Sequence, residues 1–229
     1  MSLHLSYRAD PGNPWFSWQY VRDNSDTILA ALREHTSLTA RAVVIAALVA
    51  LPLAVLAYWF RSLSAPILAV TGVLYTVPSL ALFAFLAPYL GIGAITVLTV
   101  VALYALLVIV RNALAGLTQV PPEVREAAEG MGYGRWGRLF RIELPLALPG
   151  ILTGVRLATV STVALVTVGV VVGRGGLGQL IFAGFQNNFY KAQIMTGTVL
   201  CVLLALVLDL VLAGVGRLLT PWLRGRSAR

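Results

Sequence analysis

Only a few side chains in this 229-residue chain are of types that could do chemistry. The one lysine, Lys191, follows a tyrosine and precedes an alanine, so the chain lacks the Gly-Lys-Ser/Thr ending of a phosphate-binding P-loop. The two histidines, His4 and His35, both lie in the N-terminal segment, away from the apolar stretches. We therefore predict that this chain has no catalytic residues, no metal site and no nucleotide site, and that it is not an enzyme.

A glycine-rich run at 173–178, Gly-Arg-Gly-Gly-Leu-Gly, has the spacing of a dinucleotide-binding fingerprint. That fingerprint needs a preceding strand and an acidic residue about 20 positions further on, which binds the ribose. Here the run ends an apolar stretch, and no Asp or Glu occurs between Glu143 and Asp209. We expect these glycines to turn the chain tightly as it leaves a membrane, and we predict no cofactor.

A polar interruption at 126–145 reads Glu-Ala-Ala, three residues, Gly132, nine residues, then Ile-Glu-Leu-Pro. Pro122 can open a helix just before it, and Glu126 then sits near the positive helix end. Gly132 is expected to end this helix. The helical piece that follows has an apolar side and a basic side. The apolar side consists of Trp136, Leu139 and Phe140, and the basic side of Arg135, Arg138 and Arg141.

The interruption resembles the signature Glu-Ala-Ala-x3-Gly-x9-Ile-x-Leu-Pro of permease subunits in binding-protein-dependent ABC importers, and it matches every defined position. The resemblance implies that the loop docks on a separate cytoplasmic ATPase, which would bind the ATP. The alternative is an ordinary connection that arginines hold at the lipid headgroups. Small residues at a glycine joint favour docking because another backbone can approach them closely. The expected coupling residues are Glu126, Ala127, Ala128, Gly130 and Gly132.

The rest of the sequence predicts an all-α integral membrane protein. Hydrophobic residues make up 59% of the chain and charged residues 11%, and the mean hydropathy is +0.85. A membrane-spanning helix takes about 20 apolar residues. The net charge of +8 does not indicate a nucleic-acid partner, because the basic residues sit at membrane edges. Five stretches have a suitable length, at about 38–60, 66–88, 92–110, 147–172 and 192–216.

Basic residues predict the topology of these five spans. With the 126–145 loop inside, ten arginines lie inside, whereas five arginines and Lys191 lie outside. The N-terminus is then outside and the C-terminus cytoplasmic. The inner set is Arg61, Arg111, Arg125, Arg135, Arg138, Arg141, Arg217, Arg224, Arg226 and Arg229, and the outer arginines are Arg8, Arg22, Arg33, Arg41 and Arg174.

We predict one permease domain at 38–216, with a coupling loop at about 112–146. A polar or amphipathic extracytoplasmic segment at 1–37 precedes the domain, and a basic cytoplasmic tail follows at 217–229. Charges in the first 36 residues argue against a cleavable signal peptide. Apolar residues at 19–36 have helical spacing, so this part is either a surface helix or a short polar lead-in to the first span.

Two further stretches narrow the family. The Gly-Gly-Leu-Gly turn, together with Thr-Val-Pro-Ser-Leu-Ala at 76–81 and Pro88…Gly91-Ile92-Gly93, resembles the permeases that import glycine betaine, carnitine and choline. The resemblance implies a five-transmembrane-helix type I ABC importer permease core with a cytoplasmic coupling helix, in a prokaryotic cell membrane. It also implies a second permease chain, identical or homologous, two ATPases and an extracytoplasmic binding protein. The alternatives are another cargo, such as an amino acid, or a proton-coupled secondary carrier.

Pro78, near the middle of the second predicted span, removes one helical hydrogen bond and leaves a carbonyl without its partner. Tyr75, Thr76 and Ser79 place hydroxyls close by, so these four residues could line a wet translocation pathway; a simple packing kink is the alternative. Aromatic faces suit a quaternary ammonium cargo. The candidates are Tyr75, Phe83, Phe85 and Tyr104, although aromatics in an apolar bundle more often serve packing.

Arg156 and Asp209 are charges inside apolar spans, which are costly enough to indicate a role or a partner. Both are expected one or two turns in from the cytoplasmic face. They could therefore pair with each other, or Arg156 could extend to the inner headgroups. Glycines at 150 and 154 permit close packing of the fourth span against an unspecified neighbour.

Overall fold

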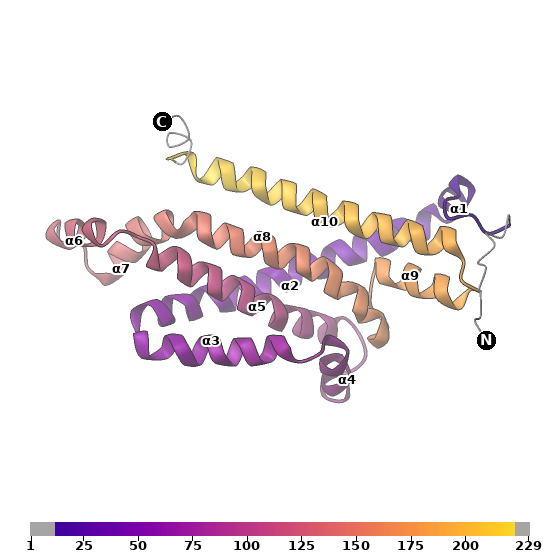
Figure 1. Cartoon of the computed structure of the whole chain (residues 1–229), viewed down its shortest axis with the longest axis horizontal. Helices are drawn as coiled ribbons and strands as arrows, with labels where there is room; N and C mark the ends of the chain where they lie inside the picture. Colours follow the sequence, from indigo (N-terminus) through magenta and orange to yellow (C-terminus); the bar gives the residue numbers. More distant parts are fainter. Residues whose placement is uncertain (1–11, 223–229) are drawn as a thin grey trace, which may run out of the picture.

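The apolar stretches form long helices in the computed structural model, which describes residues 12–222. His4 and the outer parts of the segments predicted at 1–37 and 217–229 lie outside the described residues. The helices lie along one axis, with α6 and α7 at one end and α1 and α9 at the other (Figure 1). They are α1 (Trp18–Asp23), α2 (Ser25–Trp59), α3 (Arg61–Thr76), α4 (Ser79–Leu90), α5 (Ala94–Thr118), α6 (Pro122–Gly130), α7 (Arg135–Arg138), α8 (Leu144–Val168), α9 (Leu177–Gln186) and α10 (Lys191–Leu219).

Two short irregular helices extend α8. A π-helical turn, η1 (Leu139–Glu143), joins α7 to α8, and a 3₁₀ turn, η2 (Gly169–Val172), follows α8. By length and composition, four continuous helical stretches within residues 12–222 could cross a membrane, and the bent pair α3–α4 could provide a fifth span. The all-α prediction is confirmed.

The prediction that the second span is one continuous helix at 66–88 is wrong. The chain bends by 96° between α3 and α4. Pro78 has no N–H to donate, and Val77 before it is extended, with ψ 129°, as expected for a residue that precedes proline. The Val77 carbonyl instead accepts a hydrogen bond from the Tyr104 hydroxyl of α5, so the break is stabilised from outside its own helix.

α5 is the central helix and α10 the peripheral one. In the most apolar 18-residue stretch of α5, 61% of the residues are buried. In the corresponding stretch of α10, none is buried. α5 packs on α8 at a backbone-to-backbone crossing, because a Cβ added to Gly150 would lie 2.9 Å from Gly116 Cα. The structure therefore assigns the Gly150–Gly154 packing face to α5. The facing side of α2 is a row of buried alanines, which are Ala42, Ala46, Ala50, Ala54 and Ala57.

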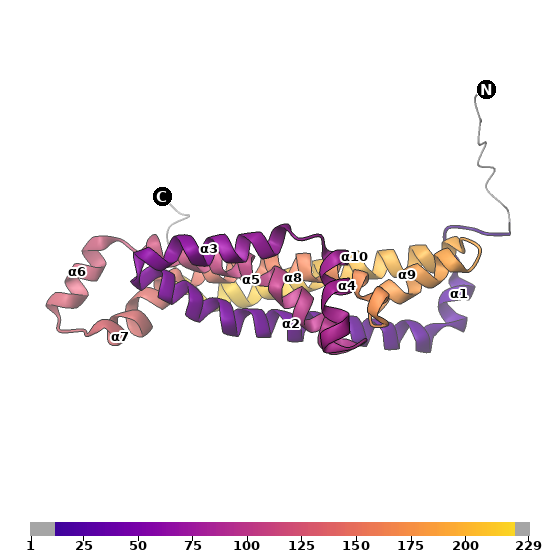
Figure 2. The same cartoon turned by 90° about the horizontal axis from the view of Figure 1, so that it is seen from below.

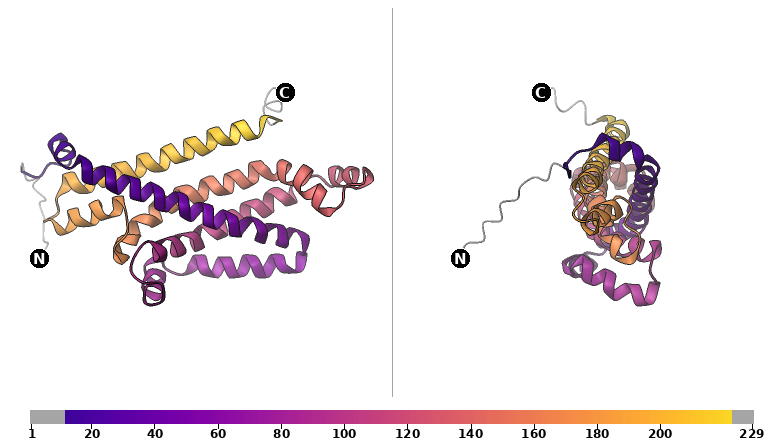
Figure 3. Two further views of the ribbon diagram at one scale, coloured as in Figure 1. Left: turned by 180° about the vertical axis from the view of Figure 1, so that it is seen from behind. Right: turned by 90° about the vertical axis from the view of Figure 1, so that its right-hand side faces the viewer.

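α2 continues without interruption across the domain boundary predicted at 37/38. Its 35 residues make a helix about 52 Å long, which exceeds the roughly 30 Å of a hydrocarbon core. The apolar spacing at 19–36 therefore belongs to α1 and to an extension of the first span, which corresponds to the lead-in alternative. Figure 3 shows α2 crossing the bundle diagonally.

The glycine-rich run forms the expected tight turn. This turn packs against His35, a residue that the sequence places outside the predicted spans. Gly176 has φ +52°, and a Cβ there would lie 2.6 Å from His35 Cβ. His35 is fully buried; its Nδ1 accepts from Leu177 N–H at 3.2 Å, so Nε2 carries the proton that it donates to the Val163 carbonyl at 3.0 Å. His35 thus joins α2, α8 and α9 as a neutral core residue.

Candidate functional site

One end of the molecule is a loop built around α6 that projects beyond α2 and α3 (Figure 2). Pro122 occupies the first turn of α6, and Glu123 lies in that turn, near the positive helix end. At the other end Gly132 has φ +82°, where a side chain would be strained, and Tyr133 N–H returns to the Ala128 carbonyl at 3.1 Å. The predicted helix start and glycine joint are confirmed.

The five predicted coupling residues divide between one buried anchor and an exposed face. Ala128 is fully buried, whereas Glu126, Ala127, Gly130 and Gly132 are exposed. A Cβ added to either glycine would meet nothing within 4 Å in this chain. The face is therefore open to a partner, although nothing in the chain alone shows which partner occupies it.

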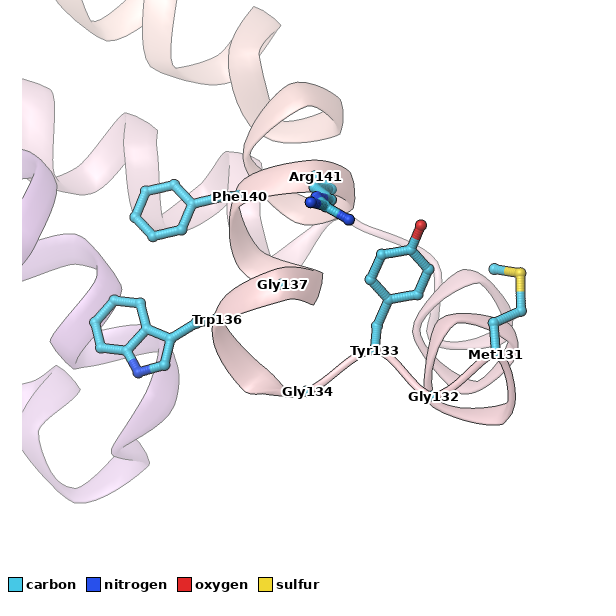
Figure 4. A pocket seen from close by; sticks show the side chains of 8 residues that line it. All are labelled: Met131, Gly132, Tyr133, Gly134, Trp136, Gly137, Phe140 and Arg141. Atoms are coloured by element: carbon cyan, nitrogen blue, oxygen red, sulfur yellow. The ribbon is translucent and has the colours of Figure 1, made fainter.

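An open hollow of about 550 Å³ lies at the joint after α6 (Figure 4). Three of its eight lining residues are glycines, so part of its lining is backbone. Tyr133 lies on one side of the hollow, and Trp136 and Phe140 point away from Tyr133 toward the bundle. A small backbone-lined hollow beside an exposed helix provides space for a partner's side chain.

The second helical piece keeps the predicted apolar side, because Trp136, Leu139 and Phe140 line one groove. Leu139 is buried, but Trp136 and Phe140 are 61% and 60% exposed, and their rings stack at 5.9 Å. Among the arginines, Arg138 is paired with carboxylates and Arg135 lies over the Trp59 ring at 4.2 Å. Arg135 and Arg138 of the predicted basic side therefore have different partners.

A buried polar cluster connects this loop to the bundle. Glu143 is fully buried, and its Oε1 lies 3.0 Å from Arg138 Nε and accepts from the Tyr58 hydroxyl at 2.9 Å. Arg125 of α6 donates to that hydroxyl at 3.3 Å, and Arg138 also pairs with Glu129 of α6. Side chains from α2, α6, α7 and η1 therefore meet around one carboxylate. Moving α6 relative to α2 must change these contacts.

Sequence reasoning missed this cluster. Glu143 occupies an undefined position of the signature, between Ile142 and Leu144, and an acid at the start of an apolar span was the available signal. Tyr58 gave no such signal, because it lies 85 residues earlier at the end of another span. Its role depends on how α2 packs beside η1.

The four predicted pathway residues, Tyr75, Thr76, Pro78 and Ser79, lie together at the break between α3 and α4. Tyr75 and Thr76 are exposed, but the Thr76 hydroxyl donates within its own helix, to the Val73 carbonyl at 2.7 Å. It therefore does not bond the backbone carbonyl that Pro78 leaves free. The break exposes the ends of two half-helices on a face that this chain does not cover.

The aromatic candidates for cargo contact differ in exposure. Phe83 is fully buried and Tyr104 is 6% exposed, so both serve the core in this chain. Tyr75 and Phe85 are 43% and 64% exposed, and the Tyr75 ring packs edge-on against Tyr104 at 5.7 Å. Only the latter two can offer a ring face outward.

Arg156 and Asp209 form the ion pair that the sequence left open. Arg156 of α8 binds Asp209 of α10 in a bidentate manner, with Nε to Oδ1 at 2.9 Å and a terminal nitrogen to Oδ2 at 2.8 Å. Planar guanidinium and carboxylate groups match in this geometry. Arg156 lines a cavity of about 300 Å³ between the two helices. The ion pair adds a polar contact to the packing of α10 on α8.

A bundle of membrane-length helices that carries an exposed, glycine-jointed loop at one end is the architecture of an integral membrane protein. The chain belongs to the family of binding-protein-dependent transport system inner membrane components, which matches residues 42–225. The predicted family is confirmed.

Two relatives cover most of the chain. It is 37% identical over 207 residues to the osmoprotectant import permease protein OsmW of Salmonella typhimurium, which covers 88% of this chain and 96% of that protein. It is 36% identical over 202 residues to the glycine betaine/carnitine/choline transport system permease protein OpuCD of Bacillus subtilis, which covers 88% of each.

Solved structures confirm the type I ABC importer permease fold. An inward-facing MetNI methionine ABC transporter superposes with a TM-score of 0.77 at 21% identity, covering 86% of this chain and 98% of the other. An amino acid ABC transporter superposes with a TM-score of 0.71 at 17% identity, covering 88% and 98%.

Proposed function

We propose that this chain is the transmembrane subunit of an ATP-driven importer and forms the pathway for a quaternary-ammonium compatible solute such as glycine betaine, choline or carnitine. The observation that carries the proposal is the 37% and 36% identity to permeases named for osmoprotectants and for glycine betaine, carnitine and choline. These alignments extend over nearly the whole chain, spans and coupling loop included.

The complete importer would contain a second permease chain, two cytoplasmic ATPase subunits that bind the ATP, and an extracytoplasmic binding protein. The exposed face of α6 supports the ATPase contact. Gly130→Leu should fold, because a Cβ there meets nothing in this chain, but it should block the approach of a partner and abolish co-purification of the ATPase. Gly214→Leu, equally unobstructed in α10, is the matched control. Normal ATPase binding by G130L would contradict docking on this face.

Basic residues support an orientation with the N-terminus outside and α6 in the cytoplasm. Because Cys201 is the only cysteine, a Cys201→Ser background allows single-cysteine labelling. Met131→Cys, exposed beside the joint, should react with an impermeant maleimide only in inside-out vesicles, and Asn187→Cys at the opposite end only in right-side-out cells. The reverse pattern would reject the orientation.

The break at α3–α4 supports a pathway lined by Tyr75, Thr76, Pro78 and Ser79. Discontinuous helices present half-helix ends, whose partial charges suit a zwitterionic solute. Tyr75→Ala or Ser79→Leu should assemble normally but transport more slowly. Wild-type transport by both variants would remove these residues from the pathway.

Reconstitution of the complex identifies the cargo. Glycine betaine, choline and carnitine, each with the binding protein, should stimulate ATP hydrolysis and enter proteoliposomes only when ATP is present. Stimulation by an amino acid instead would favour the alternative cargo. Uptake driven by a proton gradient without any ATPase would identify a secondary carrier and reject the proposal.

A further inference from the structure

An apolar groove lies between the end of α2 and the α7–η1 segment, and it shares Trp136 and Phe140 with the hollow of Figure 4. It encloses about 480 Å³, within the range of small-molecule sites, and every lining residue is apolar. Leu51, Val55 and Leu56 form its α2 wall, and Trp136 and Phe140 form the opposite wall. Such a lining suits a hydrocarbon chain.

A cation lies at one edge of this groove. The Arg135 guanidinium is 4.2 Å from the centre of the Trp59 ring and 5.1 Å from that of Phe60. Trp59 lines the groove. Arg135 is exposed and forms no ion pair with a carboxylate within residues 12–222, in contrast to Arg138. Its charge is therefore available to an anion from outside the chain.

The surroundings indicate a lipid as the occupant rather than a protein. α2 is a membrane-length helix, and the groove lies at its last turns, beside the charged residues of the loop. Tryptophan is enriched at the membrane–water interface, and Trp59 and Trp136 meet edge-to-face at 4.6 Å beside the groove. The groove is apolar, and the guanidinium at its edge has no carboxylate partner within residues 12–222. It therefore complements an amphiphile that has a hydrocarbon tail and a negatively charged head.

We propose that the groove binds one anionic phospholipid, with an acyl chain along α2 and the headgroup phosphate on Arg135. The lipid fills the space between α2 and α7 and so joins the coupling loop to the first span. Membrane lipid thereby becomes a specific component of the coupling end. This site is independent of the cargo and of the ATPase.

Native mass spectrometry of the purified, delipidated protein tests the site. Dioleoyl phosphatidylglycerol and dioleoyl phosphatidylcholine, which share their tails, are added separately. The wild type should retain one phosphatidylglycerol preferentially, and Arg135→Gln should bind it about tenfold more weakly, the loss expected for one charge-assisted contact. Arg135→Lys should keep most of the preference, and Arg22→Gln, at the opposite end, should change nothing. Equal retention of the two lipids by the wild type, or unchanged binding by R135Q, would overturn the proposal.

A second measurement identifies the occupant in the membrane. A photoreactive amino acid at Leu56, which lines only the groove, should crosslink phospholipid in intact membranes, whereas the same probe at Tyr133, which lines only the hollow, should not. A crosslink from position 56 to the ATPase or to another permease chain would overturn lipid occupancy. Because neither readout measures transport, failure here is distinguishable from failure of the proposed importer function.

Discussion

Replacing Glu143 by glutamine should loosen the coupling loop from the bundle. The carboxylate is fully buried, 3.0 Å from Arg138 Nε and 2.9 Å from the Tyr58 hydroxyl. Removing one member of a buried ion pair costs about 3–5 kcal/mol. Glutamine keeps the shape of the side chain and can still accept from Tyr58, so we expect a loss of about 3 kcal/mol. Tyr58→Phe removes a hydrogen bond to a charged acceptor and should cost about 1.5–3 kcal/mol.

The double variant tests whether the two residues act together. Both single changes disturb the same hydrogen bond, so the cost of Glu143→Gln with Tyr58→Phe should be smaller than the sum of the single costs by about 1–2 kcal/mol. Reversible unfolding in mixed micelles, titrated with sodium dodecyl sulfate, measures these free energies. Tyr133→Phe, at the same end but without a hydrogen bond from its hydroxyl in the described residues, should stay within about 0.5 kcal/mol of the wild type.

A functional readout separates positioning from simple stabilisation. With the ATPase still co-purifying, E143Q should transport fewer solute molecules per ATP hydrolysed, because Arg138, which also pairs with Glu129 of α6, loses its ion pair with Glu143. If the costs of the two single variants add up to the cost of the double variant within about 0.5 kcal/mol, the residues act independently. That result would refute the coupled cluster. A wild-type ratio of transport to hydrolysis would refute its role in positioning.

Three further perturbations follow from other contacts. Reversing either charge alone, Arg156→Asp or Asp209→Arg, should reduce the amount of folded protein in membranes, and the swapped double variant should restore it; lack of rescue would show that the pair does not hold α10. Tyr104→Phe should cost about 1–3 kcal/mol, since the backbone carbonyl at the α3–α4 break loses its partner, and unchanged unfolding would deny that bond. Gly178→Ala should lower the unfolding temperature, because its Cβ would lie 2.4 Å from a backbone oxygen of α8; Gly214→Ala, which has open space, is the control that should not.

Features set by short stretches could be predicted from the sequence. Pro122 at the start of α6 and Gly132 at its joint follow from the ring of one residue and the missing Cβ of the other. The long apolar stretches predicted membrane helices because no other element satisfies the backbone in hydrocarbon. Even the free carbonyl at Pro78 was foreseeable, although the 96° bend was not.

Features that join distant parts of the chain were decided by tertiary structure. The Val77 carbonyl at the α3–α4 break is bonded by Tyr104, which lies on the next long helix, and Glu143 meets Tyr58 across 85 residues of sequence. His35, which sequence reasoning set aside, contacts Val163 across 128 residues. Such contacts depend on the depth and rotation of each helix against its neighbours.

The sequence by itself determined that the chain is helical, crosses a membrane and carries the loop signature of a known family, because hydropathy, proline, glycine and a short signature act locally. Only the tertiary structure decided that Glu143 connects this loop to α2. The physical reason is that glycine and alanine contacts, such as Gly116 against Gly150, fix how closely the helices pack. That packing selects which polar side chains can reach one another.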